Sequence, residues 1–150
     1  MTTRILFVCL GNICRSPAAE AVFRTLAPEV ETDSAGTSGW HVGEPPYGPM
    51  QAAARLRDVA MDDLRARQFT VADFDRFDLI IGMDADNIAD MERIRPAGNR
   101  TRLQLFTDFA PASGAAAVPD PYYTRDFDGV LDLIGQCAAG LRDEIGLAQR

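Results

Sequence analysis

The chain has 150 residues, and 22 acidic against 15 basic side chains give it a net charge of −7 at pH 7. An acidic chain without a basic stripe is a poor partner for nucleic acid, and no apolar stretch reaches the length of a membrane span. Every basic side chain is arginine, which excludes Schiff-base chemistry on lysine and the lysine-dependent Walker loop.

Short apolar runs alternate with amphipathic segments, which is typical of βαβ units and a parallel sheet. In the first half of the chain we predict strands at residues 4–9 and 30–34 and helices at residues 16–27 and 50–60. We expect these helices to turn two apolar sets toward the core, namely Ala19, Val22, Phe23 and Leu26, and Ala52, Leu56 and Val59.

The second half of the chain continues the alternation, with strands predicted at residues 78–83 and 103–106 and helices at residues 84–94 and 126–147. Asp84 is the expected N-cap of the first of these helices. The last helix carries an apolar stripe at helical spacing, made of Val130, Ile134, Cys137, Leu141 and Ile145. No long linker divides the chain, so we expect one α/β domain over residues 1–150.

The most informative segment joins the first strand to the first helix, where residues 9–16 read Cys-Leu-Gly-Asn-Ile-Cys-Arg-Ser. The backbone N–H groups of such a loop can form an anion-binding nest, and the following helix adds the positive end of its dipole. Arg15 supplies a planar fork that matches two phosphate oxygens. The same field would keep the Cys9 thiol ionised, so that it can attack phosphorus.

Residues 9–16, extended by Pro17, Ala18 and Glu20, resemble the phosphate loop of the low-molecular-weight protein tyrosine phosphatases. Further matches lie at residues 33–37, 66–68, 83–87 and 120–123, so the resemblance covers nearly the whole chain. It implies a flavodoxin-like, three-layer α/β/α fold whose four parallel strands have the order 2-1-3-4. It also implies hydrolysis of phosphotyrosine through a phosphocysteine, without a cofactor or metal.

The resemblance gives the catalytic residues their roles. Cys9 is the nucleophile, and Asp120 is the general acid that protonates the leaving phenolate and then acts as base toward water. Taken alone, Asp120-Pro121 would only start a turn. Ser16 can donate its hydroxyl to the Cys9 sulfur, and it can also serve as a helix N-cap. The phosphate is bound by Leu10, Gly11, Asn12, Ile13, Cys14 and Arg15.

In the family, residues at the positions of Asn12 and Ser34 hydrogen-bond to hold the phosphate loop open. The sequence departs from many members at Leu64, where a histidine often joins this network, which bears on the rigidity of the loop. It also departs at residues 45–48, Pro-Pro-Tyr-Gly, where relatives commonly read Pro-Pro-Asp-Pro-Arg. We expect that departure to alter how flanking peptide residues are held.

Three aromatic residues, Trp40, Tyr122 and Tyr123, are expected to wall a cleft that stacks on a phenyl ring and is too deep for phosphoserine. The alternative is that they pack locally in their loops. Phosphoarginine phosphatases carry a threonine at the position of Ile13, whose hydrocarbon favours a phenyl ring over a guanidinium.

Two other functions fit the sequence less well. Arsenate reductases of this fold need further cysteines in a mobile segment, and no cysteine occurs here between Cys14 and Cys137, which falls on the apolar stripe. A non-catalytic phosphotyrosine-binding module would be expected to have lost one of the reactive residues, Cys9, Arg15 or Asp120.

The three cysteines and the single histidine limit which redox, metal-binding and acid–base functions the chain can have. Cys14 is either an apolar filler or the thiol that traps oxidised Cys9 as a disulfide. An odd number of cysteines without a secretory signal favours a cytoplasmic setting, with signal-independent export left open. His41 is expected in a solvated loop, and Asp84, Asp86 and Asp90 lack the pattern of a calcium loop.

The expected partners are phosphotyrosine-containing proteins, with a bacterial tyrosine autokinase as one candidate.

Overall fold

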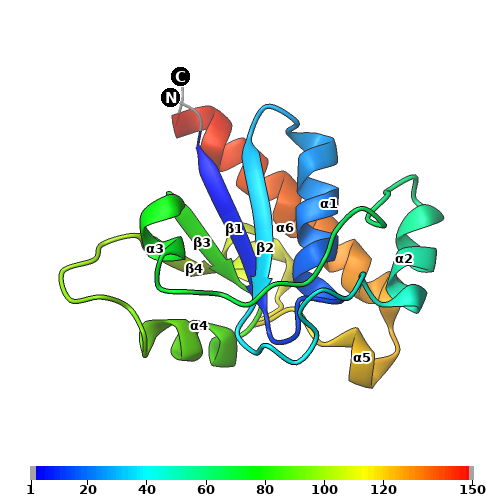
Figure 1. Ribbon diagram of the computed structural model, residues 1–150. Helices are drawn as coiled ribbons and strands as arrows, with labels where there is room; N and C mark the ends of the chain where they lie inside the picture. Colours follow the sequence, from blue (N-terminus) through cyan, green and yellow to red (C-terminus); the bar gives the residue numbers. More distant parts are fainter. Residues whose placement is uncertain (1–2, 149–150) are drawn as a thin grey trace.

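The computed structural model describes residues 3–148 and contains a four-stranded parallel sheet in the order β2-β1-β3-β4, which confirms the predicted strand order (Figure 1). Its strands are β1 (Arg4–Cys9), β2 (Glu31–Gly36), β3 (Leu79–Gly82) and β4 (Arg102–Leu105). The register pairs Cys9 with Gly36 and Val8 with Gly82. The carboxyl ends of the three strands β1, β2 and β3 therefore lie at one edge, which is where an open α/β sheet binds its ligand.

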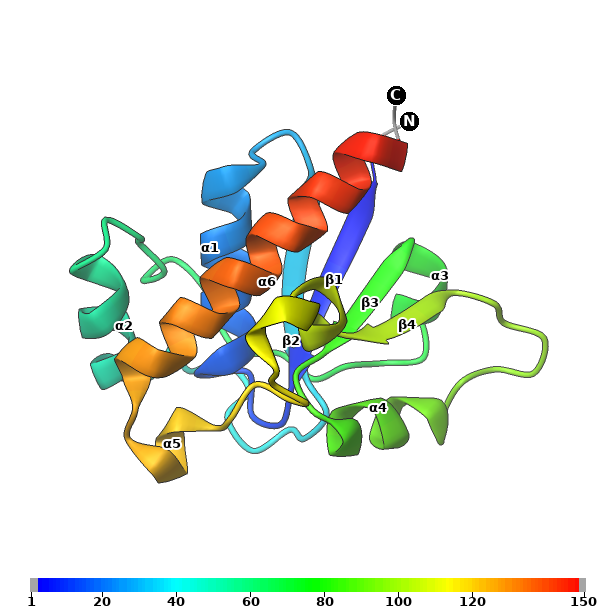
Figure 2. The ribbon, with the colours of Figure 1, turned by 180° about the vertical axis from the view of Figure 1, so that it is seen from behind.

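The two faces of the sheet are covered by different helices, and the alternation of residues along β1 divides them. Ile5 and Phe7 face α1 (Arg15–Leu26) and α6 (Phe127–Ala148), which lie in front of the strands in Figure 2. Leu6 and Val8 face the opposite layer, which contains the short helix α3 (Asp73–Arg76) and α4 (Ala85–Glu92). Two further helices, α2 (Gly48–Arg55) and α5 (Pro121–Thr124), flank the site edge.

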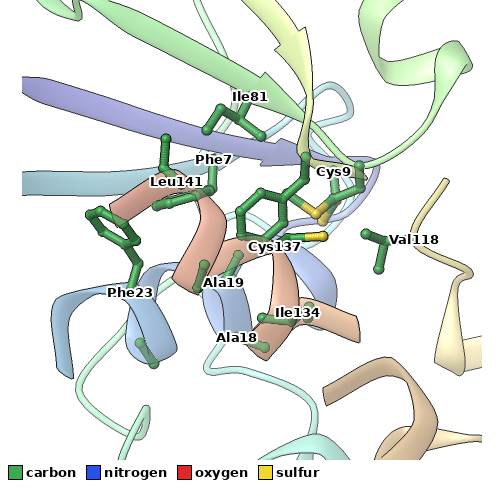
Figure 3. Packing of buried hydrophobic residues seen from close by; sticks show 14 of the residues in the cluster. Phe7, Cys9, Ala18, Ala19, Phe23, Ile81, Val118, Ile134, Cys137 and Leu141 are labelled. Carbon is green, nitrogen blue, oxygen red and sulfur yellow. The ribbon is translucent and has the colours of Figure 1, made fainter. Parts of the chain in front are cut away.

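The core on the α1 and α6 side is built around the ring of Phe7 (Figure 3). Its centroid lies 5.9 Å from that of Phe23 and 5.3 Å from that of Phe106, so three aromatic rings meet under the sheet. Small residues of α1, Ala18 and Ala19, are completely buried there. The predicted stripe of α6 is confirmed, because Val130, Ile134, Cys137 and Leu141 are buried and Ile145 is partly buried.

The prediction for the second helix is wrong in its length and in two of the three residues expected to face the core. The third residue, Val59, lies beyond the helix and is partly buried against the core. Helix α2 ends at Arg55, and Leu56 is 86% exposed, as Ala52 is also exposed. Met50 and Ala54 form the buried stripe instead, and residues two positions further along a helix point to nearly the opposite side. Asp58 then adopts a left-handed backbone, with φ of 60°, which turns the chain away from a helical path.

Smaller differences occur where elements are short. Leu26, predicted to face the core, is 37% exposed in the last turn of α1. The four-residue helices α3 and α5 were not predicted. The expected N-cap of α4 is confirmed: Asp84 and Asn87 form a reciprocal capping box.

Candidate active site

The phosphate loop, residues 9–16, runs from the end of β1 into α1, and it folds back on itself at Asn12. Asn12 has a φ of 56°, a left-handed conformation that asparagine tolerates better than most residues. Gly36 of the neighbouring strand backs the loop. A Cβ atom there would lie 2.7 Å from the Leu10 carbonyl oxygen, so only glycine lets the two backbones approach this closely.

Two polar groups converge on the sulfur of Cys9, which is buried at the base of the loop. The Ser16 Oγ lies 3.0 Å from Cys9 Sγ, and the backbone N–H of Asn12 donates to the sulfur at 3.3 Å. A hydroxyl and a backbone N–H in these positions can hydrogen-bond to the negative charge that develops on the sulfur during the reaction. Ser16 lies inside α1, whose N-cap is Cys14, so the alternative reading of Ser16 as the N-cap is wrong.

A polar network lies behind the loop. The Asn12 Nδ2 donates to Ser16 Oγ at 2.8 Å and to Ser34 Oγ at 3.0 Å, and Ser34 donates to Glu20 Oε1 at 2.8 Å. The Arg67 backbone N–H donates to Asn12 Oδ1 at 2.9 Å, which fixes the orientation of the amide. The structure thus places Asn12 and Ser34 in hydrogen-bond contact behind the loop rather than in the cavity.

The network contains two residues whose role sequence reasoning missed. Glu20 was part of the family motif, and it is buried, so that loss of hydration raises the pKa of its carboxyl. The Arg67 guanidinium bonds to Asp33 and, through two nitrogens, to the fully buried Asp73. Leu64, at the position where relatives often have a histidine, packs against the hydrophobic core.

The guanidinium of Arg15 is held in place by an aspartate and a backbone carbonyl group. Its Nη1 donates to Asp84 Oδ2 at 2.7 Å and to the Val118 carbonyl oxygen at 3.0 Å. Burial alone would lower the pKa of Arg15, but the negative charges of Cys9, Asp84 and Asp120 outweigh it and raise the pKa. A fixed cation at the wall of a buried site stabilises negative charge without reorganising when substrate arrives.

Asp120 lies beside Arg15 at the start of α5 and lines the same cavity. Its Oδ1 accepts the Tyr122 backbone N–H at 3.1 Å, which caps the helix, and its Oδ2 lies 3.5 Å from Arg15 Nη2. Pro121 occupies the first helical position, where its fixed φ suits the helix. The Asp120 side chain is 24% exposed, so water can reach it from the cavity.

The cavity above Cys9 has a volume of about 180 Å³. Its lining contains Cys9, Leu10, Gly11, Ile13, Cys14, Arg15, Trp40, His41, Asp120, Tyr122 and Tyr123. Trp40 and Tyr123 are 74% and 72% exposed, so much of each ring can meet a ligand. Local packing also occurs, because the Tyr122 ring centre lies 5.4 Å from that of Tyr123. The Cys14 thiol is buried, and burial, followed by the charges of Cys9 and Asp120, raises its pKa to about 12.

His41 lies on this wall, paired with Glu44, rather than in a fully solvated loop. Its position beside Trp40 in the sequence was the signal that could have indicated this. Among residues 3–148, no group of three or more His, Cys, Asp or Glu side chains is arranged to hold a metal ion. No helix in the same described range is long and apolar enough to span a membrane.

The nest at the end of β1, the buried cysteine at its base and the arginine fork define a cysteine-dependent hydrolase of phosphate esters. The chain belongs to the low molecular weight phosphotyrosine protein phosphatase family, whose model matches residues 4–149. This confirms the resemblance carried by residues 9–20.

Relatives agree along the whole length of the chain. The low molecular weight protein-tyrosine-phosphatase YfkJ of Bacillus subtilis is 45% identical over 136 residues, which cover 87% of each chain. Its crystal structure superimposes with a TM-score of 0.95, covering 100% of this chain and 98% of the other at 40% identity. A solved Drosophila arginine phosphatase has a TM-score of 0.87 at 26% identity, covering 94% of this chain and 96% of its own.

Proposed function

We propose that the chain hydrolyses phosphotyrosine through a phosphocysteine formed on Cys9. The observation that carries this proposal is the position of Cys9 Sγ at the floor of a cavity that has Arg15 and Asp120 on its walls. In the first step the thiolate attacks phosphorus in line, so that a P–S bond forms as the P–O bond to the phenol breaks. The proton of the Asp120 carboxylic acid goes to the leaving oxygen.

The second step returns the enzyme to its starting state. Asp120, now a carboxylate, takes a proton from a water molecule, whose oxygen attacks phosphorus. The P–S bond breaks, the Cys9 thiolate leaves and inorganic phosphate is released. Arg15 and the loop N–H groups bind the three equatorial oxygens in both transition states, and Ser16 stabilises the departing thiolate.

The walls of the cavity support phosphotyrosine as the substrate. Trp40, Tyr122 and Tyr123 offer rings on which a phenyl ring can stack. Ile13 lines the same cavity with hydrocarbon, which would leave the guanidinium of phosphoarginine without a hydrogen-bond partner. Arsenate reduction is disfavoured because Cys137 is fully buried in α6, where it cannot accept oxidation from Cys9 without unpacking the core.

The test compares one phosphopeptide carrying phosphotyrosine, phosphoserine or phosphoarginine at the same position. We expect the phosphotyrosine peptide to have the highest kcat/KM. Cys9→Ser should abolish turnover and retain binding of inorganic phosphate, since the nest and Arg15 remain. A preference for phosphoarginine, or turnover by Cys9→Ser, would contradict the proposal.

We also propose that Cys14 protects Cys9 from irreversible oxidation. Both thiols line one cavity and both are free in the structure. Peroxide would transfer one oxygen to the Cys9 thiolate, giving a sulfenic acid and water after protonation. The Cys14 thiolate would then attack the Cys9 sulfur, so that the S–S bond forms as the S–O bond breaks and the departing hydroxide takes a proton from solvent. Such a cycle fits a reducing cytoplasm, where we place the protein. There we propose phosphotyrosine-bearing proteins as substrates, a bacterial tyrosine autokinase among them.

A further inference from the structure

The short segment that carries Asp120 is held at both of its ends. At its start, the backbone N–H of the buried residue Val118 donates to the Met83 carbonyl oxygen at 2.9 Å. At its end, the residue that follows α5, Arg125, donates its backbone N–H to the Pro121 carbonyl oxygen at 2.8 Å and so closes the helix. A helix of four residues is far too short to be stable by itself, so its orientation depends on these anchors.

The second anchor is made by the side chain of Arg125. The guanidinium carbon lies 5.4 Å from the centre of the Tyr47 ring and 5.2 Å from that of Phe127, so the cation contacts two aromatic rings. The Arg125 Nη1 also donates to the Tyr47 hydroxyl at 2.8 Å. Arg125 adopts a φ of 64°, an uncommon conformation for arginine, which turns the chain so that the side chain returns across α5.

Tyr47 connects this anchor to the phosphate loop. Its backbone N–H donates to the Ile13 carbonyl oxygen at 2.8 Å, and its ring centre lies 5.2 Å from that of Tyr122. The same residue therefore contacts the loop that holds the nucleophile and the helix capped by the general acid.

We propose that Arg125 and Tyr47 are positioning residues that hold Asp120 at the correct place above Cys9. The proposal rests on the proposed function, in which Asp120 protonates the leaving phenolate. Neither residue touches the reacting atoms. They act through α5, because loosening its end would let the capping carboxylate move relative to a phosphate held by the loop. Small displacements of a proton donor slow proton transfer much more than they weaken binding.

The experiment uses aryl phosphates whose phenols differ in acidity. The value of kcat/KM reports the steps up to release of the phenol. A misplaced general acid therefore lowers kcat/KM only for substrates whose leaving phenolate needs a proton. Asparagine tolerates the left-handed backbone at this position. In Arg125→Asn we therefore expect the fold to be kept and kcat/KM for phenyl phosphate to fall by about tenfold. For 2,4-dinitrophenyl phosphate the loss should be less than about twofold.

Two further variants separate the side-chain contacts. Tyr47→Phe keeps the ring and the backbone bond to Ile13 but removes the hydroxyl, so its loss should be smaller and should not add to that of Arg125→Asn. Arg76→Asn is the matched control, since this arginine also lies over an aromatic ring, 5.4 Å from the centre of Phe77, at the amino end of β3. It should leave both substrates unaffected.

Inhibition by inorganic phosphate should be unchanged in Arg125→Asn, because the nest is intact. An equal loss for all phenols would show that Arg125 matters only for folding, and no loss would show that α5 does not need the anchor. Asp120→Asn measured in the same series distinguishes the two proposals. If the loss in Asp120→Asn is equal for all phenols, the proposed function fails. If that loss grows as the phenol becomes less acidic but the loss in Arg125→Asn does not, only the positioning role fails.

Discussion

At Cys9 two polar groups lie within hydrogen-bond distance of one sulfur atom, the Ser16 hydroxyl at 3.0 Å and the Asn12 N–H at 3.3 Å. The Ser16 Oγ accepts from Asn12 Nδ2 at 2.8 Å, so its own hydrogen can be donated to the Cys9 sulfur at 3.0 Å or to the Ala35 carbonyl oxygen at 3.3 Å. Negative charge on a departing sulfur favours the bond to the sulfur. A thiolate stabilised in this way is a better leaving group, which matters most when the phosphocysteine is hydrolysed.

Ser16→Ala should therefore slow the second step more than the first. Hydrogen bonds to a charged group contribute roughly 1.5–3 kcal/mol, so kcat should fall by roughly 10- to 100-fold. Rapid-quench measurements should show a burst of phenol followed by slow turnover. Ser38→Ala is the control, because that hydroxyl bonds to the Leu10 carbonyl oxygen and does not contact the sulfur. Loss of the burst itself would mean that Ser16 acts on the first step.

The Cys14 thiol gives a prediction on pH. Its pKa is raised to about 12, mainly by burial, so only a small fraction is ionised near neutrality. Below that pKa the thiolate fraction rises tenfold per pH unit, and only the thiolate attacks the Cys9 sulfenic acid. After a peroxide pulse, the ratio of disulfide to sulfinic acid, measured by mass spectrometry, should rise between pH 6.5 and 8.5.

Recovery of activity with dithiothreitol should rise over the same pH range. Cys14→Ser should form no disulfide and recover poorly. Cys137→Ser is the control, because its thiol is buried in α6 and its pKa is raised to about 11 by burial alone. A ratio that does not change with pH would leave Cys14 as a packing residue.

At the scale of the elements, α6 is the helix on which the core depends most, and two of its glycines lie in opposite environments. A Cβ atom on Gly140 would lie 1.8 Å from the carbonyl oxygen of Phe109, so the glycine lets the helix meet that backbone directly. A Cβ atom on Gly135 would meet nothing within 4 Å.

Gly140→Ala should destabilise the protein, and Gly135→Ala should stabilise it by up to about 1 kcal/mol, since alanine favours the helix. For Gly140→Ala we expect a loss of a few kcal/mol, because backbone atoms on both sides must separate. Urea denaturation of both variants measures the two free energies of unfolding. Similar free energies of unfolding for the two variants would show that α6 can shift away from Phe109 with little loss of stability.

The elements also show what a sequence can predict. Strand β1 and helix α6 were predicted closely, because an apolar run and a long stripe leave few alternatives. Helix α2 is rich in alanine, which fits either face, so its orientation is decided by the start at Gly48 and Pro49. Helices α3 and α5 have four residues each, too few to show a period.

The same contrast holds for the site. The phosphate loop could be predicted because its residues are contiguous, and their chemistry depends on local spacing. Among partners that are remote in the sequence, Ser34 and Asp120 were named only through the family resemblance, and others were not predicted. Arg67 lies 55 positions from Asn12, and Arg125 lies 78 positions from Tyr47, so only the fold brings each pair together.

At the scale of the whole molecule, a net charge of −7 surrounds a site that must admit a dianion. The positive charge of the site is confined to Arg15 and the phosphate loop. Four carboxylates line a hollow beside Arg15, namely those of Asp84, Asp86, Asp90 and Asp120. Beyond the loop the field therefore repels anionic substrates and attracts cationic ones.

Two phosphotyrosine peptides that differ only in flanking arginine or glutamate residues should respond to salt in opposite directions. From low salt to about 0.15 M, where the Debye length is about 8 Å, kcat/KM should fall for the arginine peptide and rise for the glutamate peptide. Both peptides are measured at the same chloride concentrations, so any binding of chloride to the phosphate loop affects the two series equally. Parallel slopes would show that only the loop governs substrate capture.

The ends of the fold have a practical consequence. Strand β1 begins at Arg4 and α6 ends at Ala148 on the side of the sheet away from the phosphate loop, and both views show these two ends close together (Figures 1 and 2). A fused domain or a surface linker joined near either end would leave the cleft facing solvent. An immobilised array of such molecules would present every active site outward, whichever end was used for attachment.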